Sequence, residues 1–377
     1  MKRPVKYLFA LLGCYGLSGW ADSETAQTES AYDRFWAGAV LYDSDDNPTI
    51  QSFSLIGRYH GQYWSVDADQ GDASDFENRR RIVGFSSKWF RHFTVQAQMY
   101  FKTSDGIYDQ LYEAFIKYSS PKTDFSISAG RLDYLFTGYE RSKSSKKINT
   151  IERGLLVNQI MPAEVVGAHM QGGVGRFSYQ AGLFSRSIED EFDDFNSGSA
   201  TVAGAGYDLP LFFEKGGLHL DYLYNSRKTE GNAFRPYRHV ISLWHSGERG
   251  RLGMGMDLTL AKPLEGDGHV WGLTLDPNWM LTEGLLGKSD ALQLVARYQY
   301  ATSSEENGLH LQRRYEEKVT KGEGDDYQAF YAGLNYYLYG HNLKLMFGGE
   351  YARMKDAADD GGAYKGWTWM GAFRVYF

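Results

Sequence analysis

The chain lacks features on which several common protein classes depend. It has one cysteine and eight prolines in 377 residues, and after residue 20 no apolar run approaches about 18 residues. A disulfide framework and a bundle of membrane-spanning helices are therefore excluded. The chain has instead 16% aromatic residues and 42% hydrophobic residues, which argues against disorder. Its length suits two or three ordinary domains or one large closed β structure.

Residues 1–21 are typical of an export signal. Lys2, Arg3 and Lys6 precede an apolar stretch, and small residues follow at 19 and 21. Cleavage would leave 37 basic residues (40 − 3) against 47 acidic ones, a net charge of −10, which makes nucleic acid a poor partner. It would also remove Cys14, the only thiol. A lipoprotein cleavage site at Cys14 is the less favoured alternative, because the apolar run before it is short.

The main pattern after the signal is alternation, which turns every second side chain to one face of a strand. In 92–102, apolar residues from Phe93 to Phe101 alternate with polar ones from Thr94 to Lys102. The segments 252–260 and 290–300 repeat the pattern. One face of each predicted strand is therefore apolar and the other is polar.

Sixteen such segments predict an all-β fold, a transmembrane antiparallel β-barrel. They are 50–66, 78–89, 92–102, 109–119, 124–133, 164–172, 175–186, 199–209, 217–227, 237–247, 252–260, 268–277, 289–301, 326–339, 342–353 and 364–377. The connections alternate between short turns and longer loops, as in outer-membrane barrels. We expect the first connection, 67–77, to be a longer loop and 134–163 to be the longest. The predicted organisation is a signal peptide at 1–21, an N-terminal periplasmic arm at 22–49 and the barrel at 50–377, with the strand-like run 33–43 inside the arm.

The last segment supports a membrane barrel. Residues 364–377 alternate with aromatic side chains and end on Phe377, which is typical of a strand that the barrel-assembly machinery recognises. Lipid offers no hydrogen-bond partners, so a sheet that closes on itself is the form that leaves no unpaired edge. The predicted location is the outer membrane of a Gram-negative bacterium, with outer-membrane lipid and lipopolysaccharide as neighbours.

Several motifs resemble the phosphate-selective porin O and P family. They are NRRRIVGFSSKWF (78–90), EAFIKY (113–118), SAGR (128–131), TIERGLL (150–156), LVARYQY (294–300) and GLNYYLYGHNLKLMFGGEY (333–351). The resemblance covers roughly 50–377. It implies a homotrimeric, sixteen-stranded porin whose long third loop folds inward to narrow each pore, and small solutes, anions such as phosphate among them, as the permeant species.

Cations at two kinds of position are the candidate pore-lining and anion-binding residues. The basic loop 134–163 contributes Arg141, Lys143, Lys146, Lys147 and Arg153, and strand phase turns Arg58, Lys102, Lys117, Arg176, Arg297, Lys344 and Arg374 inward. Four carboxylates share the inward face: Glu113, Asp221, Asp257 and Glu350. Cations in a narrow lumen can replace part of an anion's hydration. An internal salt bridge is the alternative role for each of them.

Two departures from the family pattern weaken an anion-binding series. Asp133 stands where a basic residue is expected at the pore approach, and Ile82 stands where a third basic residue is common in the second strand. The alternatives to an anion-favouring porin are a general or sugar-type porin and, less favoured, an outer-membrane hydrolase or adhesin. The histidines have no HExxH spacing and no serine lies in a GxSxG motif, so we expect neither catalysis nor a metal or other cofactor.

Overall fold

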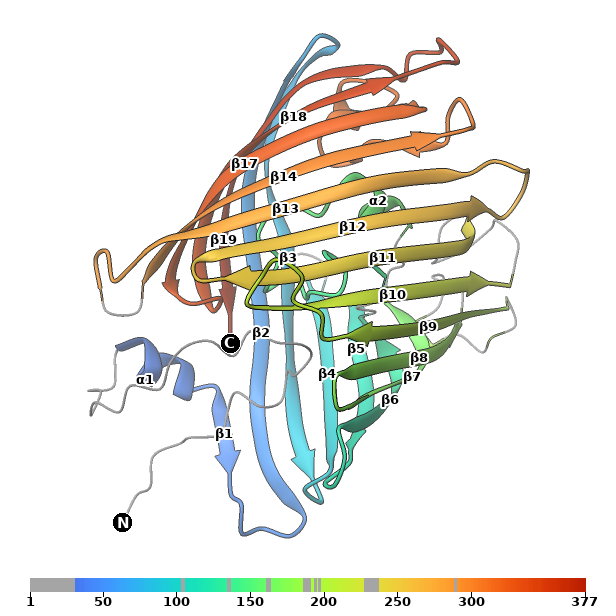
Figure 1. Cartoon of the computed structure of the whole chain (residues 1–377). Coiled ribbons are helices and arrows are strands. Elements are labelled where there is room, and N and C mark those ends of the chain that lie inside the picture. The colour runs from blue at the N-terminus through green and yellow to red at the C-terminus, as the bar shows by residue number, and fades with distance from the viewer. Residues whose placement is uncertain are drawn as a thin grey trace.

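The computed structural model describes residues 31–102, 106–133, 137–160, 164–185, 191–192, 195, 198–226, 237–287 and 290–377. Sixteen antiparallel strands form one sheet, and pairing of the last strand, β19, with β2 closes it into a barrel (Figure 1). The barrel strands are β2 (Ile50–Ala68), β3 (Gly71–Trp89), β4 (Phe93–Phe101), β5 (Tyr108–Ser119), β6 (Phe125–Leu132), β7 (Val165–Val174), β8 (Phe177–Ser185), β9 (Ser199–Tyr207), β10 (Lys215–Asn225), β11 (Tyr237–Arg249), β12 (Leu252–Pro263), β13 (Val270–Glu283), β14 (Ala291–Ser303), β17 (Asp326–Tyr339), β18 (Leu343–Lys355) and β19 (Tyr364–Tyr376). The predicted sixteen-stranded β-barrel is confirmed. Within the described residues, neither α-helix has the length and apolarity that a membrane crossing requires.

The alternation in the sequence becomes the inside and the outside of the barrel. In β14, Arg297 is 2% exposed, whereas its near neighbours Leu294 and Tyr298 are 43% and 38% exposed. The same alternation runs through β18 and β19, where every second residue is buried. Polar residues thus face the lumen and apolar residues face outward. This is the arrangement of a membrane barrel, whose outer face contacts lipid and whose interior holds water.

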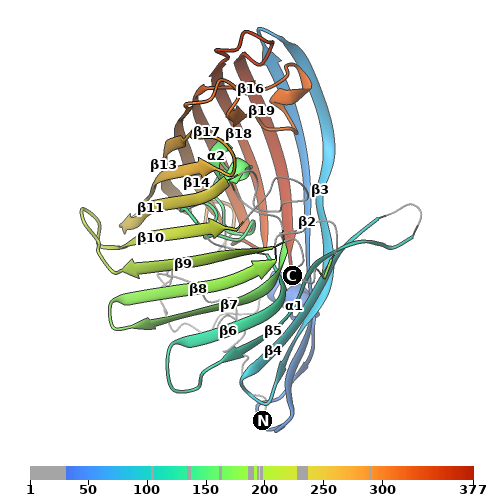
Figure 2. The ribbon, with the colours of Figure 1, turned by 90° about the vertical axis from the view of Figure 1, so that its right-hand side faces the viewer.

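The first connection differs from the expected loop. Strands β2 and β3 continue to Ala68 and from Gly71, so a two-residue turn at Asp69 and Gln70 joins them. Gly71 has a φ of +140°, a conformation that glycine adopts without the steric cost of a Cβ. The prediction of a longer loop at 67–77 was wrong, because the acidic run that suggested it lies along the rising hairpin (Figure 2).

The N-terminal arm is described from residue 31 onward; residues 1–30, with the predicted signal peptide, lie outside the described part. The run 33–43 falls mainly into helix α1 (Ala31–Ala37) and strand β1 (Val40–Asp43). Strand β1 pairs with the lower part of β2, at Ser52 to Ser54, which lies beyond the stretch paired with β19. The indole of Trp36 donates to the carbonyl of Tyr376, so the arm lies beside the C-terminal end of the barrel (Figure 2).

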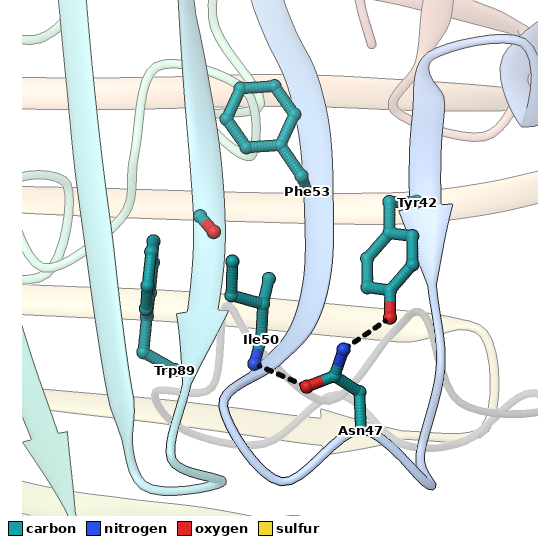
Figure 3. A pocket seen from close by; sticks show the side chains of 6 residues that line it. Tyr42, Asn47, Ile50, Phe53 and Trp89 are labelled. Atoms are coloured by element: carbon teal, nitrogen blue, oxygen red, sulfur yellow. Dashed lines mark hydrogen bonds between the residues drawn. The ribbon is translucent and has the colours of Figure 1, made fainter.

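The arm also borders a shallow apolar pocket of about 430 Å³. Tyr42 and Asn47 of the arm and its turn line one side, and Phe53 and Trp89 from β2 and β3 line the other (Figure 3). Asn47 stabilises the turn, because its side-chain oxygen Oδ1 accepts hydrogen bonds from the backbone N–H groups of Thr49 and Ile50. The first strands and the arm therefore form one continuous wall.

The third loop connects β6 to β7, and its described residues 137–160 lie inside the barrel. Its helix α2 (Leu155–Ile160) buries five of its six residues. The four apolar ones pack in a cluster with inward-facing side chains from many strands, among them Phe184, Leu223 and Val270. A Cβ on Gly272 would lie 2.4 Å from Leu156 Cδ1, so the glycine makes room for the helix. The third loop therefore narrows the lumen, as expected.

Candidate functional site

Three inward-facing cations of the strands hold the third loop by its carbonyl groups. Lys344 Nζ donates to the carbonyl oxygens of Lys146 and Ile148 at 3.0 and 3.2 Å. Arg374 donates to the carbonyls of Ser145, at 3.1 Å, and Ile151. Both cations are fully buried. The predicted inward orientation is confirmed, but these cations are engaged with the loop.

Arg297 is the most heavily engaged of the three. Its guanidinium lies 2.7 Å from Glu140 of the third loop and 2.8 Å from Glu350 of β18, and it also donates to the carbonyl of Glu152 at 2.7 Å. All three side chains of the two ion pairs are at most 6% exposed. Such a buried ion pair acts as a link between loop and wall, since removing either charge leaves the other unpaired.

Carboxylates of β10 and β12 hold the start of the same loop by its N–H groups. Asp257 of β12 accepts from the backbone N–H of Tyr139 at 2.8 Å, and Asp221 of β10 accepts from that of Gly138 at 3.4 Å. The third loop is thus fixed between an acidic wall that binds N–H groups and a basic wall that binds carbonyl groups. Each wall therefore binds the peptide groups whose partial charge is opposite to its own.

Three of the predicted loop cations are engaged within or beside the loop. Arg141 pairs with Asp133 at 2.9 Å, so the acid that departs from the family pattern neutralises a neighbouring cation. Lys143 Nζ lies 3.8 Å from the centre of the Tyr139 ring. Arg153 donates to the carbonyls of Glu140 and Lys143.

The remaining two loop lysines form a positive patch with little compensation. Lys146 is half-buried with its Nζ 5.5 Å from the centre of the Tyr376 ring, and Lys147 is exposed. No ion pair among the described residues includes either lysine. Burial, and then the charges of Lys147 and Arg58, lower the pKa of Lys146 to about 8. The patch is therefore short of negative charge.

Two strand cations complete the basic surface near the loop. Arg58 of β2 donates to the hydroxyls of Tyr112 and Ser145, each at 3.1 Å. Lys117 of β5 is half-buried and lies in register with Thr94 on β4 and with Ser128 on β6. The wall continues with neutral groups, where His169 of β7 contacts Gln180 of β8 at 3.2 Å.

The structure places two predicted pore-lining residues at the ends of strands. Lys102 follows the last residue of β4 and forms an exposed ion pair with Asp109 at 2.9 Å. Arg176 lies in the turn between β7 and β8, with its guanidinium carbon 4.7 Å from the centre of the Tyr207 ring. Their expected lumen positions were wrong, because β4 ends one residue before Lys102 and β8 begins one residue after Arg176, whereas the predicted strands included both residues.

Sequence reasoning missed two cations of β3. The register shifts between Gly61, opposite Asn78, and His60, opposite Arg80, so Arg79 is an extra residue in the strand. Arg79 Nε lies 3.0 Å from Glu152 of the third loop, and Arg80 lies 3.4 Å from the His60 ring. A β-bulge allows consecutive side chains to face the same way, which alternation does not. The signal was the run of three arginines, 79–81.

Ile82, the second departure from the family pattern, is 1% exposed and lies opposite Arg58. It therefore occupies an inward position, and an apolar side chain stands there in place of a charge. In the part of the chain that the structure describes, no group of three or more histidine, aspartate or glutamate side chains could hold a metal ion.

Comparison with known proteins agrees with this architecture. The DcaP outer-membrane channel of Acinetobacter baumannii has a TM-score of 0.56 at 10% identity, covering 89% of this chain and all of that one. OmpF of Salmonella typhi has a TM-score of 0.56 at 12% identity, covering 90% of this chain and all of that one. OmpT of Vibrio cholerae has a TM-score of 0.53 at 9% identity, covering 86% and 97%. At these identities the likeness shows the fold.

A comparison with curated proteins finds no match. The family model described as phosphate-selective porin O and P matches residues 53–236, which include the paired arginines of β3 and the third loop. The motifs at 294–300 and 333–351 lie beyond the matched residues, so their resemblance stays a prediction. Over residues 53–236 this sixteen-stranded barrel therefore matches the phosphate-selective porin O and P family.

Proposed function

We propose that the chain is an outer-membrane porin of a Gram-negative bacterium through which small solutes diffuse passively, with a preference for anions such as phosphate. The observation that carries the preference is the positive patch of Lys146 and Lys147 beside Arg58. Neighbouring cations without carboxylates repel one another, and a permeant anion relieves that repulsion. The same cations also lower the free-energy cost of removing water from the anion.

The preference is moderate in size. Most cations near the third loop are already paired or hydrogen-bonded, as Arg297, Lys344 and Arg374 are. The charges left for a solute are few, and several weak sites allow exit as well as entry. Passive flow down a gradient needs no cofactor and no energy source.

The proposed assembly is a homotrimer. Polar side chains on the outer face of β2 and β3 support it: Tyr59 donates to Asn78 at 2.6 Å, and Arg81 lies opposite Tyr59. Elsewhere the outer face carries apolar residues such as Leu294. Polar groups suit a protein neighbour better than lipid. The other proposed partners are outer-membrane lipid, lipopolysaccharide and, through the strand that ends in Phe377, the barrel-assembly machinery.

A reversal-potential measurement tests the anion preference. In planar bilayers with a KCl gradient, we expect the double substitution Lys146→Glu and Lys147→Glu to move the reversal potential toward cation preference. Lys102→Glu and Arg176→Glu are matched controls, since they reverse the same charge at the strand ends. Equal effects of the two pairs would contradict the proposed site.

A sugar-type porin is the second candidate. It is favoured by neutral groups on β7, β8 and β10, where His169, Gln180 and His219 are half-buried, and where His219 stacks on Trp244 with ring centres 3.8 Å apart. Hydroxyl-rich solutes bind to such amides and ring faces. A reversal potential of zero together with rapid liposome swelling in sugars would favour this candidate over the first.

A further inference from the structure

A second segment folds into the barrel beside the third loop. Residues 304–325, here named the lid, connect β14 to β17 and contain β15 (Leu309–His310), a 3₁₀ turn (Glu316–Lys318) and β16 (Glu323–Gly324). Leu309, Leu311 and Tyr315 of the lid are at most 4% exposed. Their burial among inward-facing side chains places the lid inside the end of the barrel that carries the long connections.

Tyr315 anchors the lid to the first barrel strand. Its ring meets that of Trp64 edge to face, with centres 5.6 Å apart, and its hydroxyl accepts a hydrogen bond from Gln62 at 2.6 Å. Arg314 beside it pairs with Glu77 of β3 at 2.6 Å. The lid therefore extends from β17 past the inner side of β18 and β19 to β2 and β3.

The lid contacts the third loop through side-chain amides and through apolar side chains. The side chain of Gln159 donates to the carbonyl of Gly308 at 2.6 Å and accepts from the backbone N–H of His310 at 3.1 Å, and that of Gln312 donates to the carbonyl of Arg153 at 2.9 Å. Leu309 and Leu311 of the lid belong to the same apolar cluster as helix α2. Water can replace the hydrogen bonds at modest net cost, so exposure of these apolar side chains is the main cost of opening the lid.

A buried carboxyl group lies under the lid. Glu316 is 1% exposed; one of its oxygens accepts from Thr368 of β19 at 3.3 Å, and the other has no hydrogen-bond partner among the described residues. The titratable groups that face it are Glu350 of β18, Tyr327 of β17 and Tyr364 of β19. Arg297, the cation beside Glu350, is already paired with Glu350 and Glu140.

We propose that the lid closes the pore from the side of the long connections when Glu316 carries a proton, and opens when Glu316 ionises. An ionised carboxylate in that position would be buried without a cation and near the charge of Glu350, which is costly. Movement of the lid into water relieves this cost. The inference rests on the chain being a channel and is independent of its preference for anions.

The direction of the pH effect follows from the two states. Burial, and then the charge of Glu350, raise the pKa of Glu316 to about 8 in the closed state. With the lid open, the carboxyl has the ordinary pKa of about 4.3. The closed state therefore binds the proton more tightly, and closure is favoured as the pH falls from 8 toward 4.3. Within that window each unit of pH changes the ratio of closed to open channels about tenfold.

The test is single-channel recording of the full chain in planar bilayers between pH 5 and pH 8.5. We expect the fraction of time in the open state to fall as the pH is lowered. Glu316→Gln, which keeps a neutral hydrogen-bonding group, should hold the lid closed at every pH. Tyr315→Ala should release the lid and give an open channel throughout. Arg313→Gln is the matched control, because Arg313 lies in the same segment with a side chain that is 78% exposed.

An open fraction that does not change with pH in the unaltered protein would overturn the proposal, as would a pH dependence that persists in Glu316→Gln. Gel mobility before and after heating shows whether each variant forms the barrel, so misfolding is recognised separately. A preparation without any conductance would refute the channel itself, whereas a steady conductance would refute only the lid.

Discussion

Two walls of the barrel use the same alternation of side chains for different purposes. On the wall of β14, β18 and β19, the inward cations Arg297, Lys344 and Arg374 are at most 2% exposed and bind the third loop. On the wall of β5 to β8, the inward residues Lys117 and Gln180 are half-buried beside polar neighbours. We name these the anchoring wall and the open wall.

The difference shows that an inward charge need not face the solute. Strand phase determines the side of the sheet on which a residue lies, and it is the same on both walls. The position of the third loop decides the rest, because a cation that the loop covers is desolvated and must be paired, whereas an uncovered cation stays hydrated. Charge counts along the lumen therefore overestimate the number of sites for anions.

The largest expected effect comes from removing the link at the centre of the anchoring wall. Arg297→Ala would leave Glu140 and Glu350 buried without their cation, at a cost of about 3–5 kcal/mol. We expect a lower temperature of barrel unfolding and, because the third loop loses its hold, a larger and noisier conductance. Heat-dependent gel mobility and single-channel recording measure the two effects. An unchanged unfolding temperature would remove the distinction between the walls.

The neighbouring residue tests the strand phase itself. Ala296 faces outward between Leu294 and Tyr298, so Ala296→Arg would place a charge against lipid, at a cost of about 2–4 kcal/mol near the bilayer midplane. We expect reduced membrane insertion, measured as the fraction of heat-modifiable protein. Ala296→Leu is the control at the same position. Normal insertion of the arginine variant would mean that the phase of β14 is shifted by one residue.

The sequence was sufficient for the barrel because the barrel depends on period-two alternation. The sixteen strands and the inward orientation of Arg297 follow from that period. The inward-folded loop follows from the family resemblance. Asp133 shows what the sequence could not supply. Its effect on anion binding stays a prediction, whereas its ion pair with Arg141 is seen only in the structure.

Features that break the period were the ones missed. Arg79 and Arg80 reach the inner side through a register shift, and the run of three arginines, 79–81, is the one sign of it in the sequence. The hairpin at Asp69 and Gln70 was mistaken for a loop because its acidic residues looked solvated. The run 33–43 was assigned to the arm and called strand-like throughout, and its helical part was missed because a helix of seven residues is too short to display a helical period.

The open wall should respond to charge without losing stability. Lys117 has no ion pair among the described residues, so we expect Lys117→Glu to change the free energy of unfolding by no more than about 0.5 kcal/mol. The reversal potential in a KCl gradient should nevertheless move toward cation preference. Lys344→Met on the anchoring wall is the contrast, with the opposite pattern: a loss of stability and a larger conductance. The same response at both positions would show that the two walls do not differ.

A substitution of Lys146 is expected to give the smallest effect of the series. It is also the most specific test, because Lys146 contacts the anchoring wall and belongs to the positive patch. Its carbonyl is held by Lys344 of the anchoring wall, while its ammonium group lies beside Lys147 in the positive patch. Since burial and the neighbouring cations lower its pKa to about 8, the group is charged below that pH and loses its charge as the pH rises through it. We therefore expect anion preference to decline between pH 7 and pH 9, and Lys146→Arg to abolish the decline, because arginine stays protonated over that range. Reversal potentials at several pH values measure the preference, whereas movement of the lid changes how often the channel is open. A decline that persists in Lys146→Arg would assign the pH dependence to another group and leave Lys146 outside the solute path.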